Sequence, residues 1–457
     1  MQAIIILALY FVVIFLIGVL THRYSKTKSD FFLANHRLGL LTTTASLTAT
    51  GIGGSATVVS LIYVYRYGLS GIWMNLAAGL GLLLLGFFYA RRIRALGVYS
   101  LPDVAGKLYD PKTRLAASII SLVVQIAWLA LLIQATALVL SAVIEIDPLI
   151  LIVVSTGLFV LYTLLGGQFA VSYSDVFQFF LMFAGVGIVA VLVLLDQAGG
   201  VSFWKSLSPD LLKFPFSEKV DLWHVLSLFL LMGLSHMVGP DIYAKILSAR
   251  NSRVARNAAL FSGVLRMVWA LIIGLLGLLA LKLLPDLENP VKIIPGLLVF
   301  FENPLLHGFV VTAFLATMMS SADTVLLTGA TIFTHDLLPR LQKKEPALWQ
   351  GKVFMVFKGS LALLLALYYQ DVIKTLELAY TVFASGLIIP LMLGFWASSL
   401  KINSRGALVA MLGGGSLALL LKLKVLSIFS GVNEIIPGTA LSFILLFLVS
   451  WVTGSKK

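Results

Sequence analysis

The 457-residue sequence contains no cysteine and few charged residues. The absence of cysteine excludes disulfides and thiolate chemistry, although it does not identify the compartment. Charged residues make up 12% of the chain, whereas a soluble domain has about 25%. Hydrophobic residues make up 60%, and apolar runs of about 20 residues, the length that crosses about 30 Å of hydrocarbon, recur throughout. The composition therefore indicates a membrane protein without a sizeable soluble domain.

Motifs typical of enzymes are also missing. The sequence has no nucleotide-binding loop, no HExxH and no GxSxG at a helix entry, so we expect a protein that is not an enzyme. The net charge of +13 could suggest nucleic acid, but the cations lie in short loops rather than on one basic face. We therefore expect no nucleic-acid partner. A channel would need a continuous polar pore, whereas the polar residues here gather at one depth.

Thirteen apolar stretches predict thirteen transmembrane helices. They cover about 3–21, 42–65, 70–90, 114–143, 148–165, 171–195, 222–245, 257–284, 306–336, 353–369, 375–398, 405–422 and 436–453. The first stretch follows no basic segment and precedes no small-residue cleavage site, so we expect it to be a retained helix rather than a signal peptide.

The distribution of cations predicts the topology. If the N-terminus is outside, 22 of the 33 Lys and Arg residues, Lys245 among them, fall in inside loops and 9 in outside segments. The positive-inside rule therefore favours a multi-pass protein of the cell inner (plasma) membrane with its N-terminus outside and its C-terminus cytoplasmic. Arg266 and Lys358 fall within spans about two turns from cytoplasmic ends, so we expect them to snorkel to the membrane surface.

Two spans contain residues that interrupt helices. These are Gly51, Gly53 and Gly54 in the second span, and Gly233, Gly239 and Pro240 in the seventh. Interrupted backbone at membrane depth belongs beside a protein-lined cavity. Because the two breaks lie five spans apart, the interrupted helices run in opposite directions, which is typical of two inverted five-helix repeats. The alternative, glycine as a close-packing residue, suits Gly79, Gly81 and Gly86.

The segment MMSSADTVLLT at 318–328 places Ser320, Ser321 and Asp323 inside an apolar run. An ionisable side chain at membrane depth costs about 2.5–3.5 kcal/mol on insertion scales, so such residues usually pair with a partner or line an ion or substrate path. A cation is the natural partner for this cluster.

Several segments resemble the sodium/solute symporter family, and especially its bacterial sodium/proline-type members. They are YTLLGGQFAVSYSDVFQFFLM at 162–182, SKTKSDFFLANHRLG at 25–39, SLPDV at 100–104, GPDIYAKILSARNSRVARNAAL at 239–260, the 318–328 segment and SRGALVAMLGG at 404–414. The resemblance implies an all-α, LeuT-type fold of two inverted five-helix repeats with flanking helices. The expected divisions are 1–41 (extra helix and loop), 42–221 (first repeat), 222–400 (second repeat) and 401–457 (two final helices).

The resemblance also implies sodium-coupled uptake of a small organic solute by alternating access. The family's shared sodium site falls on the carbonyl oxygens of Ala49, Ile52 and Thr317 and the hydroxyls of Ser320 and Ser321. Broken helices do free carbonyl oxygens, which a hard cation prefers. The alternative is that both serines bond back to carbonyls of their own helix. Some members bind a second cation, which here would involve Asp175, Asp323 and Thr324, or else one acid would hold a proton.

The sequence identifies the solute-binding residues less clearly than the sodium site. By resemblance it would draw on the second, fourth, seventh and eleventh spans, which offer Ser55, Ala56, Trp128, Gln134, Met232, His236 and Tyr380. Proline transporters of the family have aromatic residues at the positions of Met232 and His236, so proline itself is in doubt. An amino acid, an organic acid or a sugar all remain open as the solute. A proton-coupled symporter of the same fold and a transporter-like solute sensor are the alternative functions.

Overall fold

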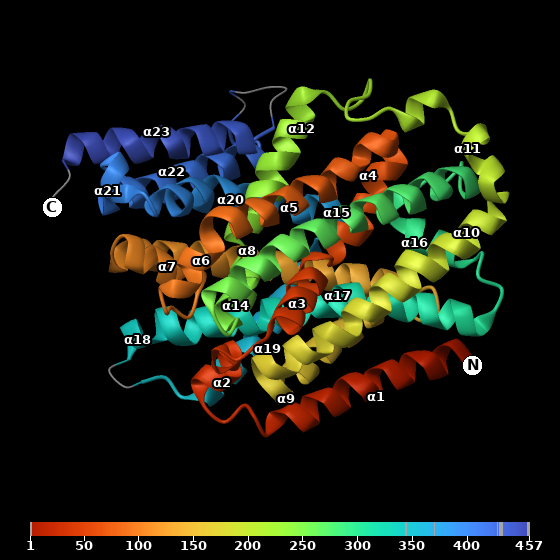
Figure 1. Ribbon diagram of the computed structural model, residues 1–457, viewed down its shortest axis with the longest axis horizontal. Helices are drawn as coiled ribbons and strands as arrows, with labels where there is room; N and C mark the ends of the chain where they lie inside the picture. Colours follow the sequence, from red (N-terminus) through yellow and green to blue (C-terminus); the bar gives the residue numbers. More distant parts are fainter. Residues whose placement is uncertain (1, 343–344, 370, 427, 429–432, 455–457) are drawn as a thin grey trace.

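The computed structural model describes residues 2–342, 345–369, 371–426, 428 and 433–454, and this part of the chain is almost entirely helical (Figure 1). The α-helices are α1 (Gln2–His22), α2 (Lys28–Leu33), α3 (Leu40–Gly51), α4 (Ser60–Tyr67), α5 (Trp73–Leu84), α6 (Ala90–Ala95), α7 (Leu101–Leu108), α8 (Pro111–Leu140), α9 (Pro148–Met182), α10 (Val191–Gln197), α11 (Phe203–Ser206), α12 (Leu222–Leu228), α13 (Ser235–Val238), α14 (Pro240–Ser248), α15 (Ser252–Leu283), α16 (Ile293–Leu298), α17 (Pro304–Ile332), α18 (Leu338–Leu341), α19 (Leu348–Tyr368), α20 (Val372–Gly394), α21 (Ala397–Leu400), α22 (Ser404–Lys422) and α23 (Ile435–Thr453). Of the shorter 3₁₀ and π segments, η2 (Ser55–Val59), η8 (Phe229–Leu234) and η10 (Phe333–Leu337) matter below.

Ten helical stretches of the described chain are long and apolar enough to cross a membrane. Two of them, Ala56–Ala95 and Pro148–Gln197, are 40 and 50 residues long, and each overlaps two predicted spans. In the second, the chain turns at Gly167, whose φ of 60° lies in the left-handed region. The predicted count of thirteen spans therefore stays a prediction, as do the division boundaries.

The helices lie roughly side by side, and α17 runs through the middle of the bundle (Figure 1). Every residue of the apolar window of α17 is buried, and this helix contacts α1, α3, α8, α9 and α19. The start of α1 and the end of α23 lie at opposite ends of the bundle (Figure 1). The short helices α2, α7 and α18 gather at the same end as the end of α23.

Both predicted helix breaks are present. Helix α3 ends at Gly51, and the chain passes through Ile52 and Gly53 before η2 and α4 continue across the bundle. Helix α13 ends at Val238, Gly239 has an extended ψ of 129°, and α14 begins at Pro240. Proline has no amide hydrogen to continue the helical ladder, so it suits the first position of a new helix.

Glycines also form a close-packed seam on α5. A Cβ atom on Gly81 would clash with the backbone of Gly233 in η8, and one on Gly79 would lie 3.0 Å from the carbonyl oxygen of Gly263 in α15. Backbone therefore meets backbone at this seam, as small residues allow in membrane helices. Gly233 consequently serves packing, whereas the break itself lies at Gly239.

The structure overturns the expectation that Arg266 and Lys358 snorkel. Both side chains are 0% exposed inside the protein. Lys358 Nζ donates to Gln125 Oε1 at 2.9 Å and to the Val325 carbonyl at 2.7 Å. Lys245, counted with the loop cations, is likewise 0% exposed and belongs to α14. Sequence distance from the end of a span does not reveal which face of a helix points inward, and these three residues point inward.

Candidate functional site

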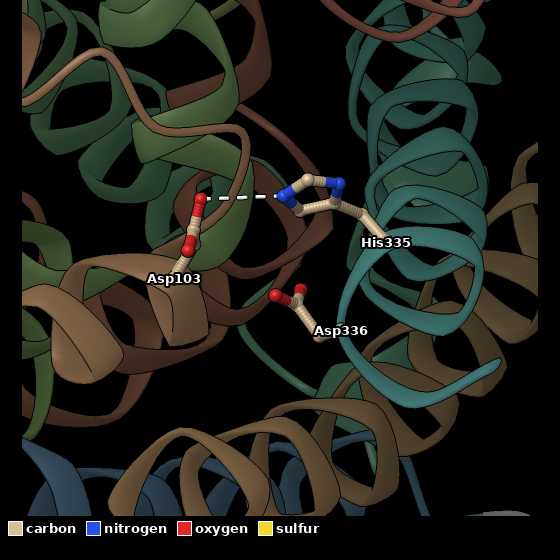
Figure 2. Close-up of side chains that lie close together, drawn as sticks. All are labelled: Asp103, His335 and Asp336. Carbon is tan, nitrogen blue, oxygen red and sulfur yellow. Dashed lines mark hydrogen bonds and ion pairs between the residues drawn. The ribbon is translucent and has the colours of Figure 1, made fainter. Parts of the chain in front are cut away.

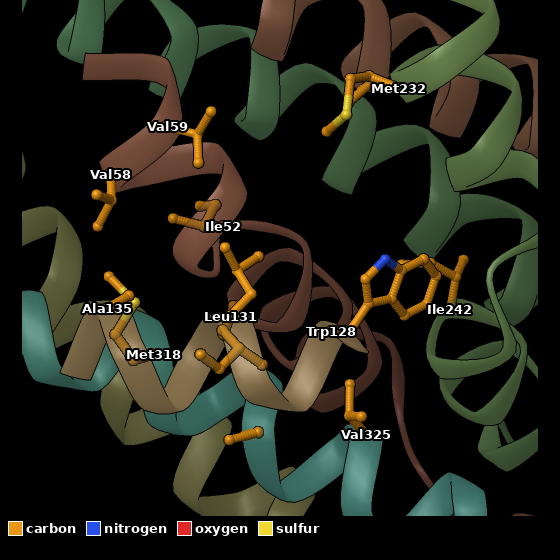
Figure 3. Packing of buried hydrophobic residues seen from close by; sticks show 14 of the residues in the cluster. Ile52, Val58, Val59, Trp128, Leu131, Ala135, Met232, Ile242, Met318 and Val325 are labelled. Carbon is orange, nitrogen blue, oxygen red and sulfur yellow. The ribbon is translucent and has the colours of Figure 1, made fainter. Parts of the chain in front are cut away.

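The two helix breaks face one small cavity in the middle of the bundle. Its volume is about 30 Å³, which is enough for water but not for an organic solute. The lining residues come from both breaks and from α8, α17 and α20, and they are Thr50, Gly51, Gly53, Gly54, Trp128, Leu131, Leu132, His236, Asp241, Ser321, Val325 and Tyr380. Figure 3 shows Ile52 of the first break close to Leu131 of α8, with Trp128 pointing toward Ile242 of α14.

Three of the five predicted sodium ligands lie together. Ser320 Oγ is 3.0 Å from the Ala49 carbonyl oxygen and 3.2 Å from the Thr317 carbonyl oxygen. Helix α3 ends two residues later, and the Ala49 carbonyl accepts both this bond and one from the Ile52 amide at 3.1 Å. The hydroxyl therefore bridges the broken helix and α17, rather than bonding only within its own helix.

The other two predicted ligands lie close by with different partners. Ser321 Oγ donates to the Thr50 carbonyl at 2.7 Å, and a Cβ atom on Gly53 would clash with this hydroxyl. Glycine at 53 is thus required for α17 to approach the break. The Ile52 carbonyl accepts from Thr57 Oγ1 at 2.8 Å, so this oxygen is already hydrogen-bonded within its own span.

Asp323 and Thr324 form a local pair beside this site. Asp323 Oδ1 accepts from the amide of Thr324 at 2.5 Å and from its hydroxyl at 3.3 Å. Thr324 Oγ1 in turn lies 3.2 Å from Thr50 Oγ1 on α3. Asp323 Oδ2 is buried with no hydrogen-bond partner among the described residues, so one oxygen of this acid is available to a proton or a cation.

Asp175 has a partner that the sequence did not suggest. Lys245 Nζ lies 2.8 Å from Asp175 Oδ2, and both side chains are 0% exposed. Ser46 Oγ donates to the same carboxylate oxygen at 2.5 Å. The ammonium group of Lys245 thus occupies the position beside Asp175 at which the sequence analysis placed a second bound cation. A buried carboxylate requires such a partner, because an unpaired buried charge is strongly destabilising.

Three of the predicted solute residues line the cavity as an aromatic box. The rings of Trp128 and Tyr380 have centroids 4.8 Å apart, and the rings of His236 and Tyr380 are stacked at 6.2 Å. His236 Nδ1 donates to the Met232 carbonyl at 2.7 Å. Trp128 Nε1 is buried and has no hydrogen-bond partner in the described chain. The box therefore offers aromatic faces and an unused donor to a ligand.

Among the described side chains, the predicted solute residues Ala56, Gln134 and Met232 do not line this cavity. Gln134 Nε2 donates to the Ala366 carbonyl at 3.2 Å and also to the Tyr369 carbonyl. The Ala56 carbonyl accepts from Asn75 Nδ2 at 2.6 Å. Met232 is fully buried one turn away from the cavity. The side chain of Ser55 lies outside the described part of the structure.

The sequence analysis missed two charged residues, one in the lining of the cavity and one beside it. Arg266 is fully buried, and its Nε, Nη1 and Nη2 atoms have no hydrogen-bond partner among the described residues. A Cβ atom on Gly51, which lines the cavity, would lie 2.8 Å from Arg266 Nη1. Asp241 lines the opposite break, and its Oδ1 atom is also buried without a partner in the described chain.

A larger cavity lies near the central one. Its volume is about 550 Å³, and it is lined mainly from α12 and the residues that flank it, His224 among them, with single residues from other helices such as Tyr63 of α4 and Glu377 of α20. Glu377 is one turn before Tyr380 on α20. A volume of this size suits a small organic molecule, so this cavity is a candidate entrance to the central site.

A charged cluster joins three helices at the end of the bundle where α2, α7 and α18 lie. Asp103 of α7, and His335 and Asp336 of η10, are close enough to share an ion, and Figure 2 shows the ion pair between Asp103 and His335. Arg114 of α8 already supplies a cation, because its Nη1 lies 3.1 Å from Asp103 Oδ1 and its Nη2 lies 2.6 Å from Asp336 Oδ1. The cluster therefore acts as a clamp between α7, α8 and η10.

The clamp shifts the titration of Asp103, which lies outside the membrane-spanning segments. Burial alone would raise its pKa. The hydrogen bond from His335, the charge of Arg114 and the hydrogen bond from the Tyr99 amide outweigh burial and hold the pKa of Asp103 below its usual value of 3.8.

Comparisons with known proteins agree with this architecture. The sequence model of the sodium:solute symporter family matches residues 31–414. The chain is 26% identical over 476 residues to the osmoregulated proline transporter OpuE of Bacillus subtilis, covering 99% of this chain and 95% of that protein. It is 26% identical over 360 residues to the human high affinity choline transporter 1, covering 74% of this chain and 62% of that protein.

A solved structure supports the fold independently. A Na+-coupled sialic acid symporter in a substrate-bound outward-open state superposes with a TM-score of 0.85 at 21% identity, covering 100% of this chain and 99% of that one. The likeness confirms the LeuT-type fold that the sequence resemblance implies.

Proposed function

The chain belongs to the sodium:solute symporter family and is a sodium-coupled symporter of a small solute, and on this premise we propose that the central cavity is its transport site. We propose that sodium binds the oxygens of Ala49, Ile52, Thr317, Ser320 and Ser321. The observation that carries the proposal is the Ser320 hydroxyl, which is 3.0 Å from one carbonyl at the α3 break and 3.2 Å from another on α17. Motion of the broken helix relative to α17 would build or dismantle such a site.

The position of Lys245 supports a proposal for the number of sodium ions. Its ammonium group already neutralises Asp175, so a second sodium at Asp175, Asp323 and Thr324 would meet a fixed positive charge. We therefore propose that one sodium ion accompanies each solute molecule. The unpartnered Asp323 Oδ2 favours the runner-up, in which a proton replaces sodium as the coupling ion.

The solute is a small organic molecule that crosses by alternating access between the two sides of the membrane. The relatives transport proline or choline by their names, which supports a compact nitrogen-containing solute. We propose that the N-terminus lies outside, that the C-terminus is cytoplasmic, and that the cavity of about 550 Å³ opens outward.

Uptake into proteoliposomes tests the coupling ion. Labelled solutes are offered under an inward sodium gradient, an inward proton gradient, or neither, at equal membrane potential. The proposal expects uptake against a concentration gradient only with sodium. Uptake driven by protons in the absence of sodium would replace it with the proton-coupled alternative.

A further inference from the structure

Two opposite charges that do not satisfy each other lie at the central cavity, one in its lining and one beside it. Arg266 Nη1 lies against Gly51, which lines the cavity at the first break, and Asp241 lines the second break. The two side chains form no ion pair with each other, and every nitrogen of the Arg266 guanidinium lacks a hydrogen-bond partner among the described residues. A buried cation without a partner is strongly unfavourable, so this group needs a ligand that the folded chain does not supply.

The surroundings of Arg266 indicate what that ligand is. A guanidinium group presents planar paired donors that match a carboxylate in a bidentate arrangement. The charge of Arg266 acts on His236, Asp241 and Tyr380, all of which line the cavity. Its charge therefore reaches the cavity, and it is not one of the exposed loop cations.

The opposite side of the cavity suits a cation. Asp241 offers a carboxylate oxygen without a partner, and the aromatic box of Trp128, His236 and Tyr380 adjoins it. Aromatic faces attract ammonium groups, including quaternary ones. The end of the cavity near Arg266 thus suits a carboxylate, and the end near Asp241 suits an ammonium group.

We propose that the transported solute is a zwitterion whose carboxylate binds Arg266 and whose ammonium group lies between Asp241 and the aromatic box. This rests on the proposed function, in which the central cavity is the transport site. The cavity of about 30 Å³ is too small for such a solute, so binding requires the breaks to open as they do in an alternating-access cycle. Neutral sugars would leave both charges unpaired.

A ligand panel on the purified full-length protein tests this. Thermal shift is measured with the protein amino acids and glycine betaine, with the carboxylate-only analogue tetrahydrofuran-2-carboxylate, with the amine-only analogue pyrrolidine, and with hexoses, each with and without sodium. We expect at least one zwitterion to raise the melting temperature, and we expect this rise to be larger with sodium. An analogue that keeps only one of the two charges of that zwitterion should bind about 10- to 100-fold more weakly. Binding confined to another class, or no zwitterion binding, overturns the inference.

Variants of Arg266 and Asp241 test which end of the solute each side chain binds. Arg266→Gln should raise the half-saturating zwitterion concentration about 10- to 100-fold while leaving the thermal stabilisation by sodium alone in place. Asp241→Asn should reduce the discrimination against the carboxylate-only analogue. Arg253→Gln removes an exposed cation from the same helix and should change neither property. If Arg266→Gln does not fold, Arg266→Lys, which keeps the charge but loses the paired donors, should give an intermediate loss of affinity, and unchanged affinity in it contradicts the assignment.

The outcomes separate this inference from the proposed function. Sodium-driven uptake of a sugar that is unaffected by Arg266→Gln would leave sodium symport standing and remove the zwitterion. Uptake that ignores sodium would instead remove the proposed coupling, whatever the solute.

Discussion

Replacement of Lys245 by glutamine should destabilise the protein and create a new dependence on sodium. Removing one partner of a buried ion pair costs about 3–5 kcal/mol because it strands the other charge. Here the stranded group would be Asp175, left with only the Ser46 hydroxyl on Oδ2. In sodium-free buffer we therefore expect unfolding of Lys245→Gln to require about 3–5 kcal/mol less free energy than unfolding of wild type.

Sodium should recover part of that loss by entering the vacated position. A ligand at 100 times its dissociation constant stabilises the folded state by about 2.7 kcal/mol. The variant should thus gain about 2.7 kcal/mol from saturating sodium beyond what wild type gains. Its sodium titration of uptake should become steeper, with a Hill coefficient rising from one toward two.

Two controls isolate the effect. Asp175→Asn with Lys245→Gln removes both charges, and this double variant should recover much of the stability with a Hill coefficient of one. Lys358→Gln removes another buried lysine whose partners are an amide oxygen and a backbone carbonyl, so it strands no carboxylate and should gain no new sodium dependence. Detergent-solubilised protein unfolded by heat and by denaturant, with and without sodium, gives the measurement. A wild-type Hill coefficient of two, or a Lys245→Gln variant as stable as wild type without sodium, would refute the reasoning.

Three further predictions address other parts of the molecule. Ser321→Ala should raise the sodium concentration for half-maximal transport about 10- to 100-fold, measured by uptake, and an unchanged sodium dependence would remove this hydroxyl from the site. In the cysteine-free chain, the exposed positions Lys107 and Arg253, changed singly to cysteine, should react with an impermeant maleimide only from the cytoplasmic side, and labelling of intact cells would reverse the topology. Because the folded pKa of Asp103 lies below its usual 3.8, the clamp with His335 contributes stability above that pH and loses it as the pH falls through the folded pKa. Thermal melts from pH 6 to pH 3 should therefore decline more steeply for wild type than for Asp103→Asn, and parallel curves would contradict this.

The sequence predicted features that depend on local chemistry. Clustered glycines in one apolar span, and a glycine followed by proline in another, disfavour continuous helix, so the breaks near Gly53 and at Gly239 could be located without a structure. The hydroxyls of Ser320 and Ser321 stood out because polar groups within an apolar run need partners. The structure adds that both hydroxyls bond across to α3, which confirms that these segments meet.

Features that depend on which face of a helix points inward could not be predicted. Lys245 lies near the end of its span and was grouped with loop cations, yet α14 turns it toward Asp175. Arg266 lies about two turns from the end of the span predicted from sequence, a distance equally compatible with snorkelling and with burial. Gln134 illustrates the reverse error, because its span does line the cavity while its own side chain points to the end of α19. Tertiary packing alone distinguishes these cases.

The glycine seam between α5 and its neighbours has a mechanical consequence. Where side chains interlock between helices, any rotation must first separate them and cross a barrier. At Gly81 and Gly233 the two helices meet through backbone atoms without side chains, so rotation of one helix against the other requires no separation of interlocked side chains. We therefore expect the span that carries the second break, and with it Asp241, to move at this contact during transport, and we expect alanine at either glycine to hinder that motion.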